Sequence, residues 1–85
     1  MMKISIEISL YPLAENKYKD EIWAFIDTLN QTEGIEVRTN GMSTQVFGEY
    51  EHTLHHVTQQ MKAVHEKLNT AVFVLKIMGC DRSHR

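Results

Sequence analysis

The spacing of hydrophobic residues changes along this chain, and those changes constrain its fold more than any other feature. Runs in which apolar and polar residues alternate are typical of half-buried strands, whereas apolar residues at spacings of three and four are typical of amphipathic helices. The first alternating run ends before Pro12, which has no N–H to donate to a strand ladder. The periods predict strands at residues 3–11, 35–39, 43–48 and 71–78. They predict helices at residues 16–29, between the first two strands, and 50–68, before the last strand.

Single residues mark the expected ends of the helices. Asn16 is placed to cap the first helix, and Gly34 breaks the chain before the next strand. Asn69 is expected to end the second helix in a left-handed conformation. Trp23 lies off the apolar stripe of the first helix, so its side chain must pack elsewhere or stay half exposed.

Asn40-Gly41 lies between two alternating runs and predicts a hairpin, because both residues tolerate positive φ. A two-residue turn would pair Val37 with Thr44 and Ile35 with Val46. A longer loop would shift that register.

This order of elements is that of the ferredoxin-like fold, an α+β βαββαβ sandwich in which two helices cover one face of a four-stranded antiparallel sheet. The strands of that topology lie in the order 4-1-3-2. The length of 85 residues allows one domain. We expect it to span residues 1–79 and residues 80–85 to form a flexible C-terminal tail.

The other face of this sheet has no helix to cover it. The last strand is apolar on both faces apart from Lys76, which is typical of a strand buried on both. A face of mixed polarity predicts packing against a second copy of the chain, a ligand, or both. Its expected members are Ser5, Glu7, Ser9, Tyr11, Gln45, Phe47, Val72 and Val74.

Composition excludes several classes of protein. Nine Lys and Arg against eleven Asp and Glu give a net charge of −2, which removes the electrostatic case for binding nucleic acid. The single cysteine, Cys80, cannot form an intrachain disulfide, which favours a reducing compartment, and we expect a cytoplasmic protein. No apolar run approaches the ~18 residues of a membrane span, so we expect no insertion into a membrane.

Glu7 is the first candidate for a binding role, because it lies in the middle of a central strand. A carboxylate on a covered face needs a donor or an opposite charge, which a cationic ligand or a protonated ring nitrogen would supply. Two other interpretations stay open: the face is wet and Glu7 only makes it more polar, or Arg38 pairs with Glu7 across the sheet.

Ser43, Thr44 and Gln45 follow the predicted turn immediately, although hairpin chemistry does not require them. They either fill the turn and strand or form a hydrogen-bonding pocket for a ligand. His52 and His56 lie one helical turn apart, but no cysteine or carboxylate completes a metal site on that face. The sequence thus predicts no metal, no cofactor and no catalytic residue.

Two segments together resemble a known family. ISLYPLAENxY at residues 8–18 and TNGMSTQVFGE at residues 39–49 resemble the YkoF-type family of proteins that bind thiamine or its hydroxymethylpyrimidine precursor. The resemblance extends to VFVLKI at residues 72–77. It implies a ferredoxin-like fold and a small-molecule ligand that is bound without catalysis, in vitamin uptake or salvage.

The resemblance also implies a ligand site. A carboxylate such as Glu7 suits the thiazolium cation or a protonated pyrimidine nitrogen, and Tyr11 or Phe47 could stack on a ring. Polar side chains of the hairpin suit the aminopyrimidine edge. The expected ligand-binding residues are Glu7, Ser9, Tyr11, Asn40, Ser43, Thr44, Gln45 and Phe47.

YkoF-type proteins carry two such modules in tandem, whereas this chain has one. Self-association would supply the second module, so we expect a homodimer or homotetramer. Two other classes of function stay open: a dimeric α+β barrel enzyme acting on a small organic molecule, and a purely structural or regulatory oligomer.

Overall fold

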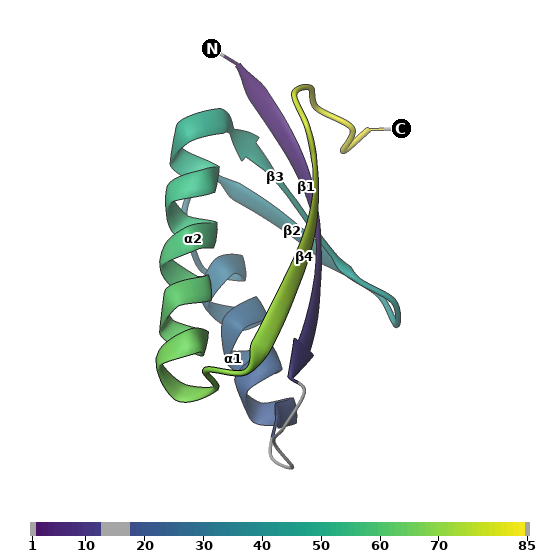
Figure 1. The fold of residues 1–85 in the computed structure, drawn as a ribbon. Coiled ribbons are helices and arrows are strands. Elements are labelled where there is room, and N and C mark those ends of the chain that lie inside the picture. Colours follow the sequence, from purple (N-terminus) through teal and green to yellow (C-terminus); the bar gives the residue numbers. More distant parts are fainter. Residues whose placement is uncertain (1, 13–17, 85) are drawn as a thin grey trace.

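The structure is a computed structural model that describes residues 2–12 and 18–84. Those residues contain the predicted elements in the predicted order (Figure 1). Asn16, the expected cap of the first helix, lies outside the described residues. The elements are β1 Lys3–Pro12, α1 Tyr18–Asn30, β2 Ile35–Thr39, β3 Thr44–Glu49, α2 Tyr50–Lys67 and β4 Ala71–Met78.

The strands form one antiparallel sheet in the order β2-β3-β1-β4, and both helices lie on the same face of it (Figure 1). This is the ferredoxin-like α+β architecture, with the strand order that the sequence predicts. β1 and β3 are central, so residues of these strands have neighbours on both sides.

The hydrophobic core lies between the sheet and the two helices. β1 contributes isoleucines at alternate positions, each almost fully buried. Full burial of a side chain of this size contributes about 1.5–3 kcal/mol, so β1 supplies a substantial part of the stabilising apolar burial. The core residues are Ile4, Ile6, Ile8, Phe25, Ile26, Leu29, Ile35, Val46, Val57, Val64, Leu68 and Ala71.

The open face of the sheet has the membership that the sequence predicts. Directly opposite residues of antiparallel strands share a face, and Glu7 lies opposite both Gln45 and Lys76. The expected burial of β4 on both faces is not met within one chain, because no helix or strand of residues 2–12 and 18–84 packs against its outer side. Val74 is 50% exposed, and Val72 and Met78 are also exposed.

The predicted register of the β2–β3 hairpin is wrong by two residues. Thr39 pairs with Thr44, and Val37 pairs with Val46 instead of Thr44. A shift of two keeps every side chain on its predicted face, since side chains alternate with a period of two.

The side chain of Asn40 explains the longer turn. Its Oδ1 accepts hydrogen bonds from the backbone N–H groups of Met42 (2.8 Å) and Ser43 (3.1 Å). This arrangement stabilises a loop of residues 40–43, in which neither Asn40 nor Gly41 needs positive φ. The Asn-Gly pair therefore predicts the hairpin correctly but not its length.

α2 begins directly after β3, with no connecting loop. Glu49 is the last residue of β3 and also the N-cap of α2. Its carboxylate accepts hydrogen bonds from the backbone N–H groups of Glu51 (3.2 Å) and His52 (2.9 Å). These bonds satisfy donors at the helix start that have no partner within the helix.

α2 ends at Lys67, one residue before its predicted end, and its C-cap is Leu68. The N–H of Leu68 donates to the carbonyl of Val64 (2.7 Å). The prediction of Asn69 as a left-handed cap is wrong, because Gly34 alone among the described residues has positive φ (85°). Gly34 breaks the chain before β2 as expected.

The side chain of Thr53 places a hydroxyl group in the buried interior of the protein. The residue is fully buried, and its Oγ1 has no hydrogen-bond partner among the described residues. A buried hydroxyl without a partner costs about 1–3 kcal/mol, so we expect Thr53→Val to raise the free energy of unfolding by about 1–2 kcal/mol in urea denaturation. Thr58→Val is the control, because its hydroxyl donates to the carbonyl of Leu54 (2.8 Å) at an exposed site. A less stable Thr53→Val protein would contradict this prediction.

We expect His56 to make the free energy of unfolding depend on pH. Burial, and then the neighbouring imidazoles of His52 and His55, lower the pKa of His56 from its ordinary value of 6.5. Near that pH the unfolded chain binds more protons than the folded one, so we expect the free energy of unfolding to fall as the pH drops through this range. Urea denaturation between about pH 8 and pH 5.5 measures the fall, and His56→Gln should flatten it. An unchanged fall in His56→Gln would assign the effect to another group.

Candidate functional site

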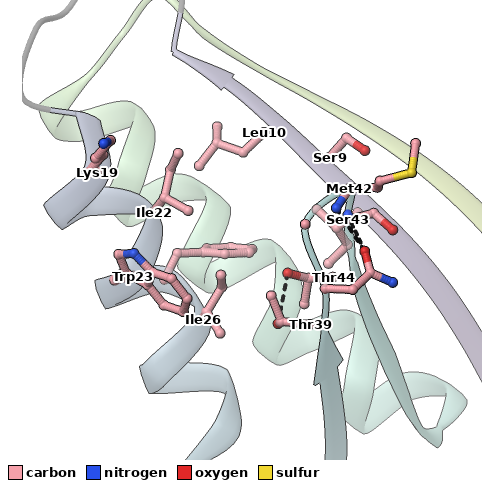
Figure 2. Close-up of a pocket in the computed structure, with 14 residues that line it drawn as sticks. Ser9, Leu10, Lys19, Ile22, Trp23, Ile26, Thr39, Met42, Ser43 and Thr44 are labelled. Atoms are coloured by element: carbon pink, nitrogen blue, oxygen red, sulfur yellow. Dashed lines mark hydrogen bonds between the residues drawn. The ribbon is translucent and has the colours of Figure 1, made fainter.

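A cavity of about 340 Å³ lies between α1 and the β2–β3 hairpin (Figure 2). Its volume is in the range of sites for small organic ligands, about 300–1,000 Å³. We call it the helix–hairpin pocket. Its lining residues are Ile8, Ser9, Leu10, Lys19, Ile22, Trp23, Phe25, Ile26, Thr39, Asn40, Gly41, Met42, Ser43 and Thr44.

Polar groups line the hairpin side of this pocket. The hydroxyls of Thr39 and Thr44 lie 3.1 Å apart and share a hydrogen bond. The loop that Asn40 closes carries Ser43 beside them. Because Asn40 fixes its own loop through Oδ1, its amide NH₂ is the part of the side chain left to donate to a ligand.

Apolar groups line the α1 side. Figure 2 shows Trp23 and Ile26 on α1, facing Thr39 and Thr44 of the hairpin across the cavity. Trp23 is 56% exposed, as expected for a residue off the apolar stripe. An aromatic wall opposite a row of hydroxyls can hold a flat ring that is apolar on its faces and polar at its edge.

Glu7 connects the pocket to the open face of the sheet. Ser43 Oγ donates a hydrogen bond to Glu7 Oε2 (3.0 Å), and Lys76 Nζ lies 3.6 Å from Glu7 Oε1. The interpretation of Arg38 as the partner of Glu7 is wrong, because Arg38 Nε donates to Glu36 Oε2 (2.7 Å) instead. Arg38 lies beside Glu36 on the same short strand, which makes that pair local.

A second hollow, of about 270 Å³, lies on the open face. Phe47 lines it but is only 7% exposed, and the guanidinium carbon of Arg38 lies 5.2 Å from its ring centroid. Phe47 therefore has little free surface for stacking on a ligand in the single chain. The lining residues are Ser5, Ile6, Glu7, Gln45, Phe47, Lys76, Ile77, Met78 and Arg82.

The predicted ligand-binding residues divide between these two places. Ser9, Asn40, Ser43 and Thr44 line the helix–hairpin pocket. The open-face hollow contains Glu7, Gln45 and Phe47, and the exposed Tyr11 lines neither. The hydrogen bond between Ser43 and Glu7 is the link between the two groups.

Sequence reasoning did not assign Trp23 and Lys19 to a site. The signal for Trp23 was present, because a large aromatic residue off the apolar stripe of a helix needs another place to pack. Nothing in the sequence around Lys19 distinguished it from other exposed lysines. That α1 faces the hairpin follows from the fold and not from local sequence.

The histidines of α2 form a separate cluster. The ring centroids of His52 and His56 lie 4.6 Å apart, and His52 Nε2 lies 2.8 Å from the carbonyl oxygen of Glu33. Over residues 2–12 and 18–84, no three His, Cys, Asp or Glu side chains converge to hold a metal ion.

The fold and the pocket define a class: a small ferredoxin-like α+β domain with a cavity between its first helix and its central hairpin. Within that class, the family model described as the YKOF-related family matches residues 3–79. That match covers nearly the whole sequence, so the chain belongs to the YkoF-related family.

Solved structures share the fold at low sequence identity. A Streptococcus pneumoniae protein has a TM-score of 0.78 at 16% identity, covering 98% of this chain and 92% of its own. A hypothetical protein of Methanocaldococcus jannaschii has a TM-score of 0.79 at 23% identity, covering 100% and 86%. A Thermotoga maritima protein, provisionally described as one of thiamine biosynthesis or salvage, has a TM-score of 0.70 at 20% identity, covering 88% and 81%. At these identities the likeness shows the fold alone.

No curated protein sequence matches the chain significantly. In the part of the chain that the structure describes, neither helix is long and apolar enough to cross a membrane.

Proposed function

We propose that this protein binds thiamine or its hydroxymethylpyrimidine precursor in the helix–hairpin pocket, without catalysis, in vitamin uptake or salvage in the cytoplasm. The observation that carries the proposal is the position of the Trp23 indole across a 340 Å³ cavity from the hydroxyls of Thr39 and Thr44. Membership of the YkoF-related family and the description of the Thermotoga maritima protein support the same ligand class.

The pyrimidine half of the ligand explains the composition of the pocket. An aminopyrimidine is flat and apolar on its two faces, so one face can stack on the indole of Trp23. Its ring nitrogens and amino group need donors and acceptors at the edge, and Asn40, Ser43 and Thr44 offer both. The ring face thus contacts the apolar wall of the pocket, and the ring edge forms hydrogen bonds with the polar wall.

Glu7 acts on the ligand through Ser43. Because Ser43 Oγ donates to the Glu7 carboxylate, its lone pairs are directed away from Glu7 and can accept a hydrogen bond from an amino group. The negative charge of Glu7, only partly offset by Lys76 at 3.6 Å, also favours a cationic or protonated ligand.

Calorimetric titration with thiamine and, separately, with hydroxymethylpyrimidine tests the proposal. We expect saturable binding that weakens about tenfold in Ser43→Ala and in Glu7→Gln, since each substitution removes or weakens a hydrogen bond to a charged group. Glu36→Gln is the matched control, because Glu36 pairs with Arg38 and lines neither the pocket nor the open-face hollow. No heat at millimolar ligand would refute the function. Binding that is equal in all four proteins would refute the site.

A second copy of the chain is the partner that we propose for the open face. Tyr11, Val72, Val74 and Met78 are between 41% and 51% exposed there, and β4 is an edge strand with free backbone groups along one side. Association through this strand or face would bury these side chains and give a homodimer, or a homotetramer if two dimers pair.

Size-exclusion chromatography with light scattering measures this assembly. We expect a mass of at least twice 9.9 kDa at micromolar concentration. Val74→Lys should lower the measured mass, because it places a charge in the apolar contact. Thr58→Lys, on the exposed side of α2, should leave the mass unchanged. A mass of 9.9 kDa for the unmodified chain would contradict the proposal.

A further inference from the structure

The chain beyond β4 turns back over the open face of the sheet, on the side away from the helices (Figure 1). We name residues 79–84 the C-terminal strap. All of them except residue 79 lie beyond the residues that match the family model, 3–79. The flexibility expected of residues 80–85 stays a prediction, but the described residues of this segment make specific contacts with the sheet.

Ser5 holds the strap in both directions. Its hydroxyl donates to the carbonyl of Cys80 (2.7 Å) and accepts from the backbone N–H of Arg82 (2.9 Å). Ser5 lies on the central strand β1 and is only 9% exposed. Ser5 thus makes two hydrogen bonds to a segment 75 or more residues away in sequence.

The strap itself is ordered around Ser83, which is 6% exposed despite being one of the last residues. The N–H of Ser83 donates to Asp81 Oδ1 (2.8 Å). The side-chain and then the backbone hydrogen bond from Ser83 lower the pKa of the Asp81 carboxyl. Asp81, Ser83 and Phe47 line a common hollow, so the strap lies beside Phe47. Phe47, which is buried although it is on the open face, thus has the Arg38 guanidinium over its ring and the strap close by.

The strap therefore divides the open face into two ends. At one end the strap is held by Ser5 and lies beside Phe47. The other end carries Tyr11, Val72 and Val74 and is exposed.

We propose that the C-terminal strap competes with a second copy of the chain for the open face, so that its release from Ser5 opens the Phe47 end and strengthens self-association. This inference rests on the self-association proposed above and is independent of the helix–hairpin pocket, which none of the strap residues lines. The strap sets how much of the face a second copy can cover.

Substitutions in the full chain test whether the strap is held as described. Ser5→Ala removes both hydrogen bonds to the strap, and Ser83→Glu places a charge at a buried position, which expels it. Hydrogen exchange read by mass spectrometry should show the amide of Arg82 exchanging about tenfold faster or more in both variants. The matched controls are Ser9→Ala, on the same strand and face, and His84→Glu, which adds a negative charge at the exposed neighbouring position; both should exchange like the unmodified chain.

Sedimentation velocity over a range of concentrations then tests the competition. We expect the dissociation constant for self-association to fall about tenfold in Ser5→Ala and Ser83→Glu, because an uncovered phenylalanine joins the contact, and to stay constant in the two controls. A strap that is released without tighter association would overturn the inference. An Arg82 amide that already exchanges at the rate of an unstructured peptide in the unmodified chain would also overturn it.

Ser5→Ala, Ser83→Glu and His84→Glu should bind thiamine or hydroxymethylpyrimidine as the unmodified chain does, because none of these three residues lines the helix–hairpin pocket. Loss of ligand binding in every protein, with the association results as expected, would refute the proposed function and leave the strap inference standing.

Discussion

Gly48→Ala should destabilise the protein by about 3 kcal/mol, because the site has no space for a methyl group. A Cβ on Gly48 would lie 2.4 Å from Thr53 Oγ1 and 2.8 Å from the carbonyl oxygen of Gly34. One of these atoms belongs to the backbone, so the clash cannot be relieved by rotating a side chain alone. Urea denaturation with an unchanged m value would measure the loss.

Gly41→Ala is the control for this prediction, because nothing lies within 4 Å of a Cβ at that position. We expect a change within about 0.5 kcal/mol. Thr53→Ala combined with Gly48→Ala should recover part of the loss, since it removes the nearer obstacle, and a double-mutant cycle would give the coupling. Full stability in Gly48→Ala would mean that β3 and α2 can separate without cost, contrary to their packing in the structure.

Trp23→Leu should weaken the binding of thiamine or hydroxymethylpyrimidine by roughly tenfold to a hundredfold. Stacking of a heterocyclic base on an aromatic side chain contributes about 1–3 kcal/mol, and leucine keeps apolar contact but loses the stacking surface. Because Trp23 is 56% exposed, we expect little change in the stability of the fold. Calorimetry measures the dissociation constant. The chain has one tryptophan, so quenching of its fluorescence by the ligand provides a second readout at the pocket.

Trp23→Phe is the matched variant and should keep most of the affinity, since phenylalanine also presents an aromatic face. Gln45→Ala distinguishes the two hollows, because Gln45 lines the open-face hollow and not the helix–hairpin pocket. Binding that is lost in Gln45→Ala and unchanged in Trp23→Leu would move the ligand to the open face.

The order and type of the elements follow from hydrophobic period alone, because each element buries one face and the period reports which one. The ends of the helices and strands are harder to predict, since the conformation and contacts of single residues decide them. Asn40 closes a longer turn through its side chain. α2 ends because Leu68 leaves the helical conformation (φ −128°, ψ 76°), and Asn69 is not left-handed.

The candidate site was predicted in part. The polar residues of the hairpin are recognisable because they exceed what a turn requires, and they do line a cavity. Trp23 and Lys19 come to that cavity from α1, which is distant in sequence from the hairpin. The polar sequence of the strap gives no sign that it contacts the sheet, although Ser5 makes two hydrogen bonds to it.

Glu49 joins β3 to α2 without a loop, and Asn40 fixes the opposite end of β3. Both ends of β3, on the hairpin side of the pocket, are therefore held in place without a ligand. A ligand in this pocket should need little ordering of the hairpin, which leaves more of the contact energy available as affinity. Binding should accordingly be fast and free of slow conformational phases, with the hydrogen-bonding edge already in place for the incoming ring.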